Sequence, residues 1–414
     1  MSEWLRTDVA IVGGGPSGLS AAMELRRRGL ARVIVLEREP QAGGVPRHCA
    51  HPPFGMREFG RVLSGPEYAR RLHSAAVRAG VDVRVRHSVV ALNPGGTLTV
   101  SSPTGLVTVQ ARRVVLATGA RETSRAARLV SGERPLGVMN TGTFQGCVSL
   151  KQLRPFMRPV IVGTELVSVS AILTCVRHGV RPAAIIEAAD GPSARWPLGL
   201  VTRLLGIPVY LQSRITQING SMQVRSVEVT SNAGRRRDIP CDGVIFSGEF
   251  LPESALLRMD GTVLVDSASG GASIDQFGRC TDPVYFAAGN ALRPIETAGW
   301  CYREGRAVGT SVAQDLEAPW PALETALPLL CGAGIRFAVP QRIVPSRHAS
   351  AFGHIQIRAR SRSSGRLTVR YQGQILWSER RHFHPDRRYT IPLKDIRIPP
   401  GAASLSIAIE SDPG

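Results

Sequence analysis

Short apolar runs and amphipathic stretches alternate along most of the chain. Mostly apolar runs predict strands over 8–12 and 32–37, and apolar positions three and four residues apart between them predict a helix over 17–28 that Gly29 ends. The same strand–helix–strand pattern returns at 159–162, 165–177 and 183–187. We also expect helices over 65–79 and 296–315, a hairpin over 97–109, and strands at 81–85, 114–117, within 209–230, and at 242–246 and 284–288.

This alternation predicts an α/β fold of two nested Rossmann-like domains with a small C-terminal all-β domain. The first dinucleotide-binding domain is expected to be discontinuous, over 1–125 and 235–318, and the second to cover 126–234. A linker is expected over 319–334. Short alternating runs between turn residues then predict a β-rich domain of sandwich type over 335–414.

The composition excludes several classes of protein. The net charge is +19, yet 49 of the 51 basic residues are arginines spread along the chain, so we interpret them as solvated surface and expect no nucleic-acid partner. An acidic partner or a membrane face stays open as the alternative. None of the seven cysteines forms a CxxC pair, so the chain by itself signals no metal or iron–sulfur site.

The chain lacks a basic start followed by an apolar run, and its longest apolar stretch, 160–176, carries Glu165. We therefore expect a cytoplasmic protein with reduced thiols, with peripheral association at the inner face of the membrane left open.

A glycine-rich turn follows the first strand directly. Gly13, Gly15 and Gly18 form a GxGxxG pattern, with Pro16 and Ser17 opening the helix. The first glycine permits a tight turn, the second lets the backbone approach a pyrophosphate, and the third lets helix and strand pack closely. The helix N-terminus then faces the phosphates.

Further residues agree with a dinucleotide site. Glu37 ends the second strand 19 residues past Gly18, where a carboxylate can accept ribose hydroxyls. Small residues close two later strands. The predicted cofactor-binding set is Gly13, Gly15, Pro16, Ser17, Gly18, Glu37, Arg38, Gly44, Ala117, Thr118, Gly119, Gly289, Asn290 and Thr297.

The second glycine turn is degenerate. Gly163 occupies its first position, but Glu165 stands where the backbone must approach a pyrophosphate, and Ser168 takes the third place. A carboxylate there would crowd and repel a phosphate. Binding of NAD(P) is therefore doubtful, unless Glu165 turns outward.

These motifs resemble the two-dinucleotide-domain, glutathione-reductase-like flavoproteins. The resemblance implies that the first unit binds FAD and that the helix from Glu296 aims its N-terminus at the flavin. Asn290 stands where the family has aspartate, and it can hydrogen-bond a ribityl hydroxyl. In the family's disulfide reductases a cysteine pair follows Gly43-Gly44, but Pro46 and His51 occupy those places, so no dithiol relay is expected.

Two stretches, 44–57 and 288–299, more specifically resemble the FAD subunits of opine oxidase, hydrogen cyanide synthase and dye-linked amino-acid dehydrogenase complexes. The resemblance implies an FAD-dependent oxidoreductase that relays electrons in a complex with a second flavoprotein dehydrogenase subunit plus a small iron–sulfur subunit. The substrate would be an amino acid, opine, amine or glycerol 3-phosphate-like compound. Several members carry a cysteine-rich segment that this chain lacks.

The loop over 47–57 offers the candidate catalytic groups. Arg47 can stabilise a reduced flavin or a carboxylate, His48 and His51 can move protons, and Glu296 lies at the start of the late helix. The alternative for each is loop packing. Two further functions stay open: a free-standing NAD(P)H-dependent flavin reductase, and a mainly structural subunit in which the β domain docks a partner.

Overall fold

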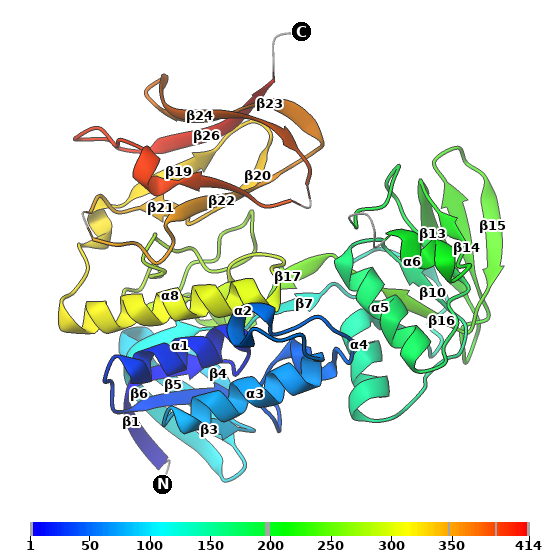
Figure 1. The fold of residues 1–414 in the computed structure, drawn as a ribbon, viewed down its shortest axis with the longest axis horizontal. Helices are drawn as coiled ribbons and strands as arrows, with labels where there is room; N and C mark the ends of the chain where they lie inside the picture. Colours follow the sequence, from blue (N-terminus) through cyan, green and yellow to red (C-terminus); the bar gives the residue numbers. More distant parts are fainter. Residues whose placement is uncertain (1–2, 195–198, 347, 386, 412–414) are drawn as a thin grey trace. The chain divides into compact units, whose positions relative to one another are not determined.

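The computed structural model describes residues 3–194, 199–346, 348–385 and 387–411 (Figure 1). The chain divides into two compact units. The first comprises Met1–Gly44, Ala69–Ala120 and Leu251–Gly414, and the second comprises Val45–Tyr68 and Arg121–Phe250. Each unit contains a parallel sheet with helices, so the predicted α/β class is confirmed.

The first unit is organised by a seven-stranded sheet in the order β3-β2-β1-β6-β5-β4, with β18 also paired to β6. The ladders that join β3, β2, β1, β6 and β18 are parallel, whereas β4, β5 and β6 pair antiparallel. All five residues of β2 are buried, as a parallel strand covered on both faces requires. The strands are β1 (Glu3–Val12), β2 (Val33–Glu37), β3 (Asp82–Val85), β4 (Ser88–Asn93), β5 (Thr97–Ser102), β6 (Gly105–Leu116) and β18 (Tyr285–Ala287).

Two helices far apart in sequence pack closely in this unit. They are α1 (Pro16–Arg27) and α8 (Ala298–Glu317). A Cβ at Gly305 would lie 2.0 Å from the Ser17 carbonyl oxygen, and one at Gly309 would lie 2.7 Å from that of Ala21. The glycines of α8 therefore let the two backbones approach.

The second unit repeats the parallel arrangement. Its main sheet has the order β12-β11-β10-β16-β9, and a second sheet has the order β15-β14-β13-β8. The expected second βαβ pattern is present as β10, α5 and β11. The bounds are β8 (Ser131–Gly132), β9 (Val138–Asn140), β10 (Pro159–Val162), β11 (Ala184–Ile186), β12 (Val209–Tyr210), β13 (Ser213–Asn219), β14 (Ser226–Ser231), β15 (Arg236–Pro240), β16 (Gly243–Phe246), α4 (Thr141–Gln145), α5 (Leu166–Arg177) and α6 (Gly199–Leu204).

The C-terminal segment of the first unit forms two sheets around one core. A five-stranded sheet has the order β21-β19-β26-β23-β24, and a three-stranded sheet has the order β20-β22-β25. Buried side chains of both sheets, such as Ile357, Leu367 and Ile391, share one cluster, so the expected sandwich is present. The strands are β19 (Leu327–Cys331), β20 (Ile335–Val339), β21 (Arg342–Ile343), β22 (His354–Ala359), β23 (Ser363–Tyr371), β24 (Gln374–Phe383), β25 (Tyr389–Pro392) and β26 (Leu405–Ser411).

The structure differs from the expected boundaries at this end. The segment 319–334, expected as a linker, contains β19, which pairs with β21 and β26. Trp320, from the same segment, stacks on Phe277 with 4.3 Å between ring centroids. The β-rich segment also belongs to the same compact unit as the first Rossmann-like sheet. The shift in composition at this point accompanies the change from α/β to all-β structure.

The remaining elements are α2 (Met56–Phe59), α3 (Gly65–Arg78), α7 (Ala255–Asp260), β7 (Ala120–Glu122) and β17 (Phe250–Pro252), the last two forming a two-stranded sheet.

Among the described residues, no helix combines the length and the apolar character needed to span a membrane.

The Trp320–Phe277 stack predicts a large loss of stability when it is removed. Trp320 is 8% exposed, so Trp320→Ala should cost about 3–5 kcal/mol through lost packing and the cavity left behind. Thermal unfolding followed by circular dichroism measures the change. Trp4→Ala is the control, because Trp4 is 64% exposed. Equal melting temperatures of the two variants would contradict the assignment of Trp320 to the core.

Candidate dinucleotide-binding site

The first glycine turn has the geometry that a dinucleotide requires. Gly13 has φ 108°, and a Cβ there would lie 2.4 Å from the Ala117 carbonyl oxygen. A Cβ at Gly18 would lie 1.9 Å from the Gly13 carbonyl oxygen, so this glycine allows close packing of helix and strand. A Cβ at Gly15 would meet only the Cα of Gly44, at 3.8 Å, so the space beside Gly15 is open.

The start of α1 faces that open space. Gly15 is the N-cap residue, no side chain caps the helix, and Pro16 occupies the first turn. A phosphate can therefore accept the backbone N–H groups at this helix start. Ser17 serves a different purpose from the expected cofactor contact, because its hydroxyl donates to the carbonyl oxygen of Cys301 at 3.0 Å and joins α1 to α8.

A carboxylate is fixed at the end of β2. Glu37 is buried, and its two oxygens accept the backbone N–H of Gly14 at 2.9 Å and of Glu39 at 2.8 Å. These bonds hold the carboxylate next to the glycine turn, where it can also accept ribose hydroxyls. Arg38, the following residue, is exposed.

The two later small-residue motifs also belong to this unit. Ala117 is buried at the end of β6, and the Thr118 hydroxyl donates to the Glu253 carbonyl oxygen at 2.8 Å. Gly119 has φ 77°, and a Cβ there would meet no atom within 4 Å. A Cβ at Gly289 would lie 2.0 Å from the Ser17 hydroxyl, so this position admits no side chain.

Asn290 holds a turn with its side-chain amide. Its Oδ1 accepts the backbone N–H of Glu296 at 2.7 Å, and its Nδ2 donates to the Glu296 carbonyl oxygen at 3.2 Å. Both amide atoms thus shape the segment that leads to Thr297, the N-cap residue of α8. The ribityl contact expected of Asn290 would have to share these atoms. Taken together, the open space at Gly15, the fixed carboxylate and the start of α8 fit FAD.

The loop after Gly44 belongs to the second unit from Val45 onward. Arg47 and His48 are half-buried in a 3₁₀ turn, Val45–His48. The ring of His51 contacts the Ser170 hydroxyl through Nε2 and the Pro52 carbonyl oxygen, at 2.8 Å, through Nδ1. Both ring nitrogens of His51 are therefore engaged in packing its loop against α5, which argues against the expected proton-transfer role.

Cys49 is a packed thiol. It is buried, with its sulfur 3.4 Å from Gln145 Oε1, and burial, with Glu122 as the further cause, raises its pKa to about 12. The reactive thiolate is therefore suppressed at neutral pH. All seven cysteines are free.

Glu122 is a candidate acid–base group that the sequence did not reveal. It accepts the backbone N–H of Gly142 at 2.8 Å, and burial raises its pKa to about 7. A Cβ at Gly142 would lie 3.3 Å from Glu122 Oε2 and 3.8 Å from His48 Cε1, so the carboxyl and the imidazole lie close together. A carboxyl group with a pKa near neutral pH and a neighbouring imidazole are a pair of side chains that can transfer a proton to or from a substrate. In the sequence, the only feature that could have suggested a role for Glu122 is its position three residues after Ala117-Thr118-Gly119.

The second glycine turn holds a carboxylate of its own. A Cβ at Gly163 would lie 2.5 Å from Glu165 Oε2, and a Cβ at Gly248 would lie 2.9 Å from Glu165 Cδ. The Ser247 hydroxyl donates to Glu165 Oε1. Burial raises the pKa of this carboxyl group. Glu165 therefore turns inward, over the glycine turn and at the start of α5.

Glu187 repeats the arrangement of Glu37. One Glu187 oxygen accepts the backbone N–H of Ala189 at 2.9 Å, just as Glu37 accepts the backbone N–H of Glu39. The other Glu187 oxygen accepts a hydrogen bond from the Thr164 hydroxyl, whereas the other Glu37 oxygen accepts a backbone N–H. The second unit thus keeps a carboxylate directly after β11, in the position that corresponds to Glu37 of the first unit.

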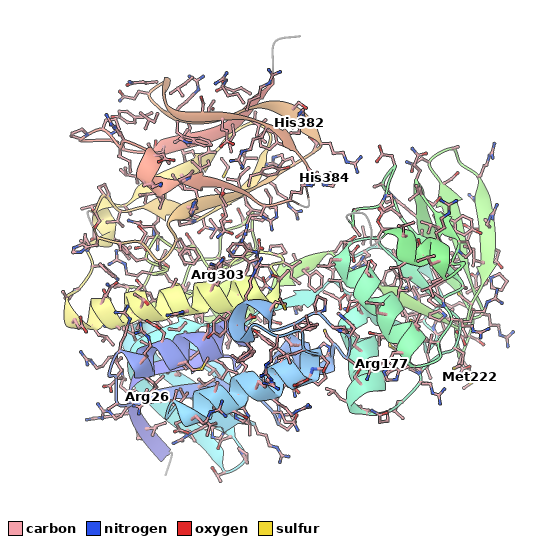
Figure 2. The ribbon with its side chains drawn as sticks, viewed as in Figure 1. Arg26, Arg177, Met222, Arg303, His382 and His384 are labelled. Carbon is pink, nitrogen blue, oxygen red and sulfur yellow. The ribbon has the colours of Figure 1, made fainter. Side chains whose placement is uncertain are left out.

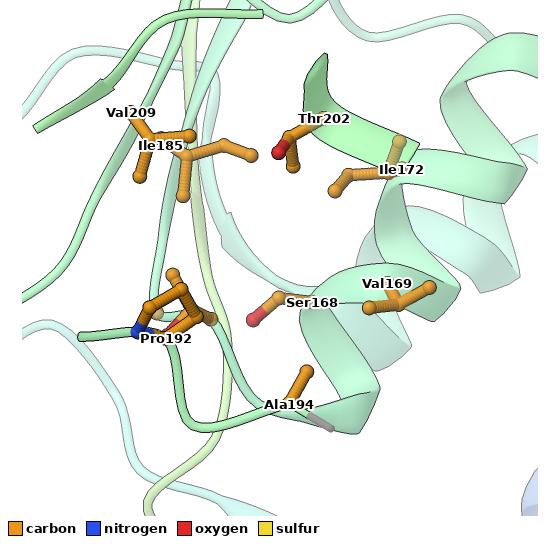
Figure 3. A pocket seen from close by; sticks show the side chains of 10 residues that line it. Ser168, Val169, Ile172, Ile185, Pro192, Ala194, Thr202 and Val209 are labelled. Carbon is orange, nitrogen blue, oxygen red and sulfur yellow. The ribbon is translucent and has the colours of Figure 1, made fainter. Parts of the chain in front are cut away.

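A nearby segment closes this second turn further. The backbone N–H groups of Ser193 and Ala194 donate to Thr164, to its hydroxyl at 3.0 Å and its carbonyl oxygen at 2.9 Å. The cavity that remains is about 30 Å³, the space of one water molecule (Figure 3). Its lining is mostly apolar: Gly163, Thr164, Ser168, Val169, Ile172, Ile185, Pro192, Ala194, Thr202 and Val209.

Two Rossmann-like folds in one chain, the first with a complete dinucleotide site, define a flavin-dependent oxidoreductase of the glutathione-reductase-like class. The chain belongs to the pyridine nucleotide-disulphide oxidoreductase family, whose pattern matches residues 7–305. It is an FAD-dependent oxidoreductase, as the sequence predicted.

Several characterised proteins are similar to the chain. The ferredoxin reductase component of chlorobenzene dioxygenase from a Cupriavidus species is 28% identical over 73% of this chain and 69% of its own length. The HcnB subunit of hydrogen cyanide synthase from Pseudomonas aeruginosa is 28% identical, over 53% of this chain and 50% of its own. An opine oxidase subunit from Agrobacterium tumefaciens is 26% identical over 62% of this chain and 55% of its own length. The chain thus spans about half the length of these last two relatives.

Solved structures agree on the fold. The thioredoxin reductase of T. acidophilum superposes with a TM-score of 0.65 at 22% identity, covering 76% of this chain and 99% of that one. L-proline dehydrogenase from P. horikoshii gives a TM-score of 0.57 at 20% identity, covering 77% of this chain and 57% of the dehydrogenase chain.

Loss of the Glu37 carboxylate should weaken FAD binding. Glu37→Ala removes an acceptor for ribose hydroxyls and leaves two backbone N–H groups without their partner, so the dissociation constant should rise roughly 10- to 100-fold. Flavin fluorescence during reconstitution of the apoprotein measures it. Glu39→Ala, at an exposed neighbouring position, is the matched control. An unchanged dissociation constant for Glu37→Ala would remove Glu37 from the site.

The raised pKa of Glu122 predicts a pH-dependent stability. Between its ordinary value of 4.5 and about 7, the folded chain holds the proton that the unfolded chain has lost, so stability falls as pH rises through this range. Glu122→Gln should be more stable than the natural chain at pH 8, by roughly 1–3 kcal/mol, and nearly equal to it at pH 5. Melting temperatures at both pH values test this. Glu324→Gln, at an exposed site, is the control, and the same pH dependence in both variants would contradict the shift.

Proposed function

We propose that this chain is the electron-transferring FAD subunit of a multi-subunit dehydrogenase that oxidises an amino acid, opine or amine, or a glycerol 3-phosphate-like compound. The observation that carries the proposal is the contrast between its two glycine turns. The first is open beside Gly15, whereas Glu165 lies over the second. A flavin that nicotinamide does not reduce needs another electron donor, and we assign that role to a partner subunit.

Electrostatics and space both oppose a nicotinamide dinucleotide at the second turn. A pyrophosphate there would lie against the Glu165 carboxyl group, which repels a phosphate when it is ionised. The Glu165 side chain also fills the volume next to Gly163 and Gly248. The Glu187 carboxylate is engaged by Thr164.

The named relatives support a multi-subunit setting. The matched chains of opine oxidase, hydrogen cyanide synthase and sarcosine oxidase are each one subunit of their enzyme. By this likeness the partners are a second flavoprotein dehydrogenase subunit, which oxidises the substrate, and a small iron–sulfur subunit. The proposal places the assembly in the cytoplasm.

Arg47, His48 and Glu122 are the proposed reactive groups of this chain. Arg47 would stabilise negative charge, and the neighbouring His48 and Glu122 would move a proton. The contacts of His51 with Ser170 and Pro52 assign it to loop packing instead. Glu296 lies among arginines, and its carboxylate is occupied by them.

A free-standing reductase is the second candidate. The similarity to a ferredoxin reductase component favours it. The inward Glu165 opposes it. A purely structural subunit is disfavoured by the complete first glycine turn, whose glycines have no role in docking a partner.

Isolation of the assembly tests the proposal. The tagged chain is purified from its native cells together with bound proteins, and amine, amino-acid and glycerol 3-phosphate substrates are offered with an artificial dye. We expect a second flavoprotein to co-purify and the FAD of this chain to be reduced by substrate only in the assembly. Rapid reduction of the isolated chain by NADPH or NADH would favour the reductase instead.

Removing the Glu165 side chain should reopen the second turn. Glu165→Gly restores glycine at the second position of the pattern, so NADH should bind at least tenfold more tightly than to the natural chain. Isothermal titration calorimetry measures this. Leu166→Ala, at the exposed neighbouring position, should leave binding unchanged. If Glu165→Gly binds NADH no better than the natural chain, Glu165 is not what closes the site.

A further inference from the structure

A buried cluster of charges lies at the start of α8. The Glu296 carboxylate accepts a hydrogen bond from Arg358 Nη2 at 2.7 Å and from Arg388 Nη1 at 3.4 Å. Arg293 Nε lies 3.9 Å from the same carboxylate. Glu296 immediately precedes Thr297, the N-cap residue of α8.

Arg293 adds a third guanidinium group to the cluster. Its side chain is 0% exposed and pairs with Glu304, which also accepts a hydrogen bond from Gln356 at 3.2 Å. Within the described part of the chain, Nε and Nη1 of Arg293 have no hydrogen-bond partner. Three arginines, 293, 358 and 388, face two glutamates, 296 and 304, so the cluster carries a net positive charge.

Two of these arginines come from the C-terminal β sandwich. Arg358 lies on β22, and Arg388 directly precedes β25, its neighbour in the three-stranded sheet. The guanidinium carbon of Arg388 also lies 3.7 Å from the ring centroid of Trp300, in the first turn of α8. The sandwich thus contacts the beginning of α8 twice, through Glu296 and through Trp300.

We propose that the C-terminal sandwich is part of the flavin centre, with Arg358 and Arg388 as positioning residues that fix the first turn of α8 and make its surroundings positive. The start of α8 lies beside the first glycine turn, because the Ser17 hydroxyl donates to the Cys301 carbonyl oxygen, and the family resemblance implies that this helix start faces the flavin. A flavin that gains two electrons and one proton carries a negative charge, which the positive helix start and the net-positive cluster stabilise. The sandwich would therefore raise the reduction potential of the FAD.

This role differs from a docking role for the sandwich. A module that only binds a partner would leave the flavin of the isolated chain unaffected by substitutions at Arg358 or Arg388. The role is also independent of the proposed electron-transfer function, because the potential of the bound FAD is measured without a partner, a substrate or NADH.

The test is the midpoint potential of FAD in the full-length holoprotein, followed spectroscopically against redox dyes. Arg388→Gln and Arg358→Gln should each weaken the binding of reduced relative to oxidised flavin by about tenfold, which lowers a two-electron potential by about 30 mV. Arg303→Gln is the matched control, because exposed Arg303 stacks on the same Trp300 ring, at 5.2 Å, outside the cluster (Figure 2). Its potential should equal that of the natural protein.

Arg388→Lys separates charge from geometry and guards against misfolding. It keeps the positive charge, so its potential should lie closer to the natural value than that of Arg388→Gln. A lowered melting temperature with an unchanged potential in both glutamine variants would overturn the proposal and leave the cluster a purely structural one. An equal fall in Arg303→Gln would overturn it too, because the effect would not depend on the cluster.

Discussion

The close approach of α1 and α8 is the constraint on which the flavin unit depends. Gly305 lies against the backbone of Ser17, and the Ser17 hydroxyl binds the Cys301 carbonyl oxygen. Segments nearly 300 residues apart thereby bring their helix starts into one site. A side chain at Gly305 or Gly289 would push the helices apart and separate the phosphate-binding turn from the start of α8.

The two Rossmann-like units show how one position changes the use of a shared fold. Both have a tight first glycine, Gly13 or Gly163, and both end their second strand in a carboxylate held by the backbone two residues on. They differ at the second position of the turn, where Gly15 leaves space and Glu165 fills it. In the second unit an internal carboxylate lies at the helix start that a phosphate would otherwise occupy.

The sequence was sufficient for the parts of the fold that local patterns determine. The alternation of apolar runs predicted both βαβ units, and β10 spans the residues expected for it, 159–162. The inward direction of Glu165 was one of two alternatives, because a side chain's rotamer depends on contacts such as that with Ser247, 82 residues away.

Long-range pairing explains what local patterns did not predict. Glu296 was expected to be catalytic, but its partners Arg358 and Arg388 lie 62 and 92 residues further along the chain. Glu122 has an ordinary sequence context, and its burial in the folded chain is the main cause that raises its pKa to about 7. The sandwich was expected to be a separate domain because composition changes at 319–321, yet tertiary contacts join it to the first unit.

The most direct test of a flavin that nicotinamide cannot reduce is an anaerobic spectrum of the purified chain with its FAD bound, recorded before and after excess NADH and then NADPH. We predict that the oxidised flavin bands persist for minutes, because Glu165 closes the second glycine turn, while a chemical reductant such as dithionite bleaches them at once. Bleaching by either nicotinamide within seconds would contradict this prediction and would make the chain a reductase in its own right.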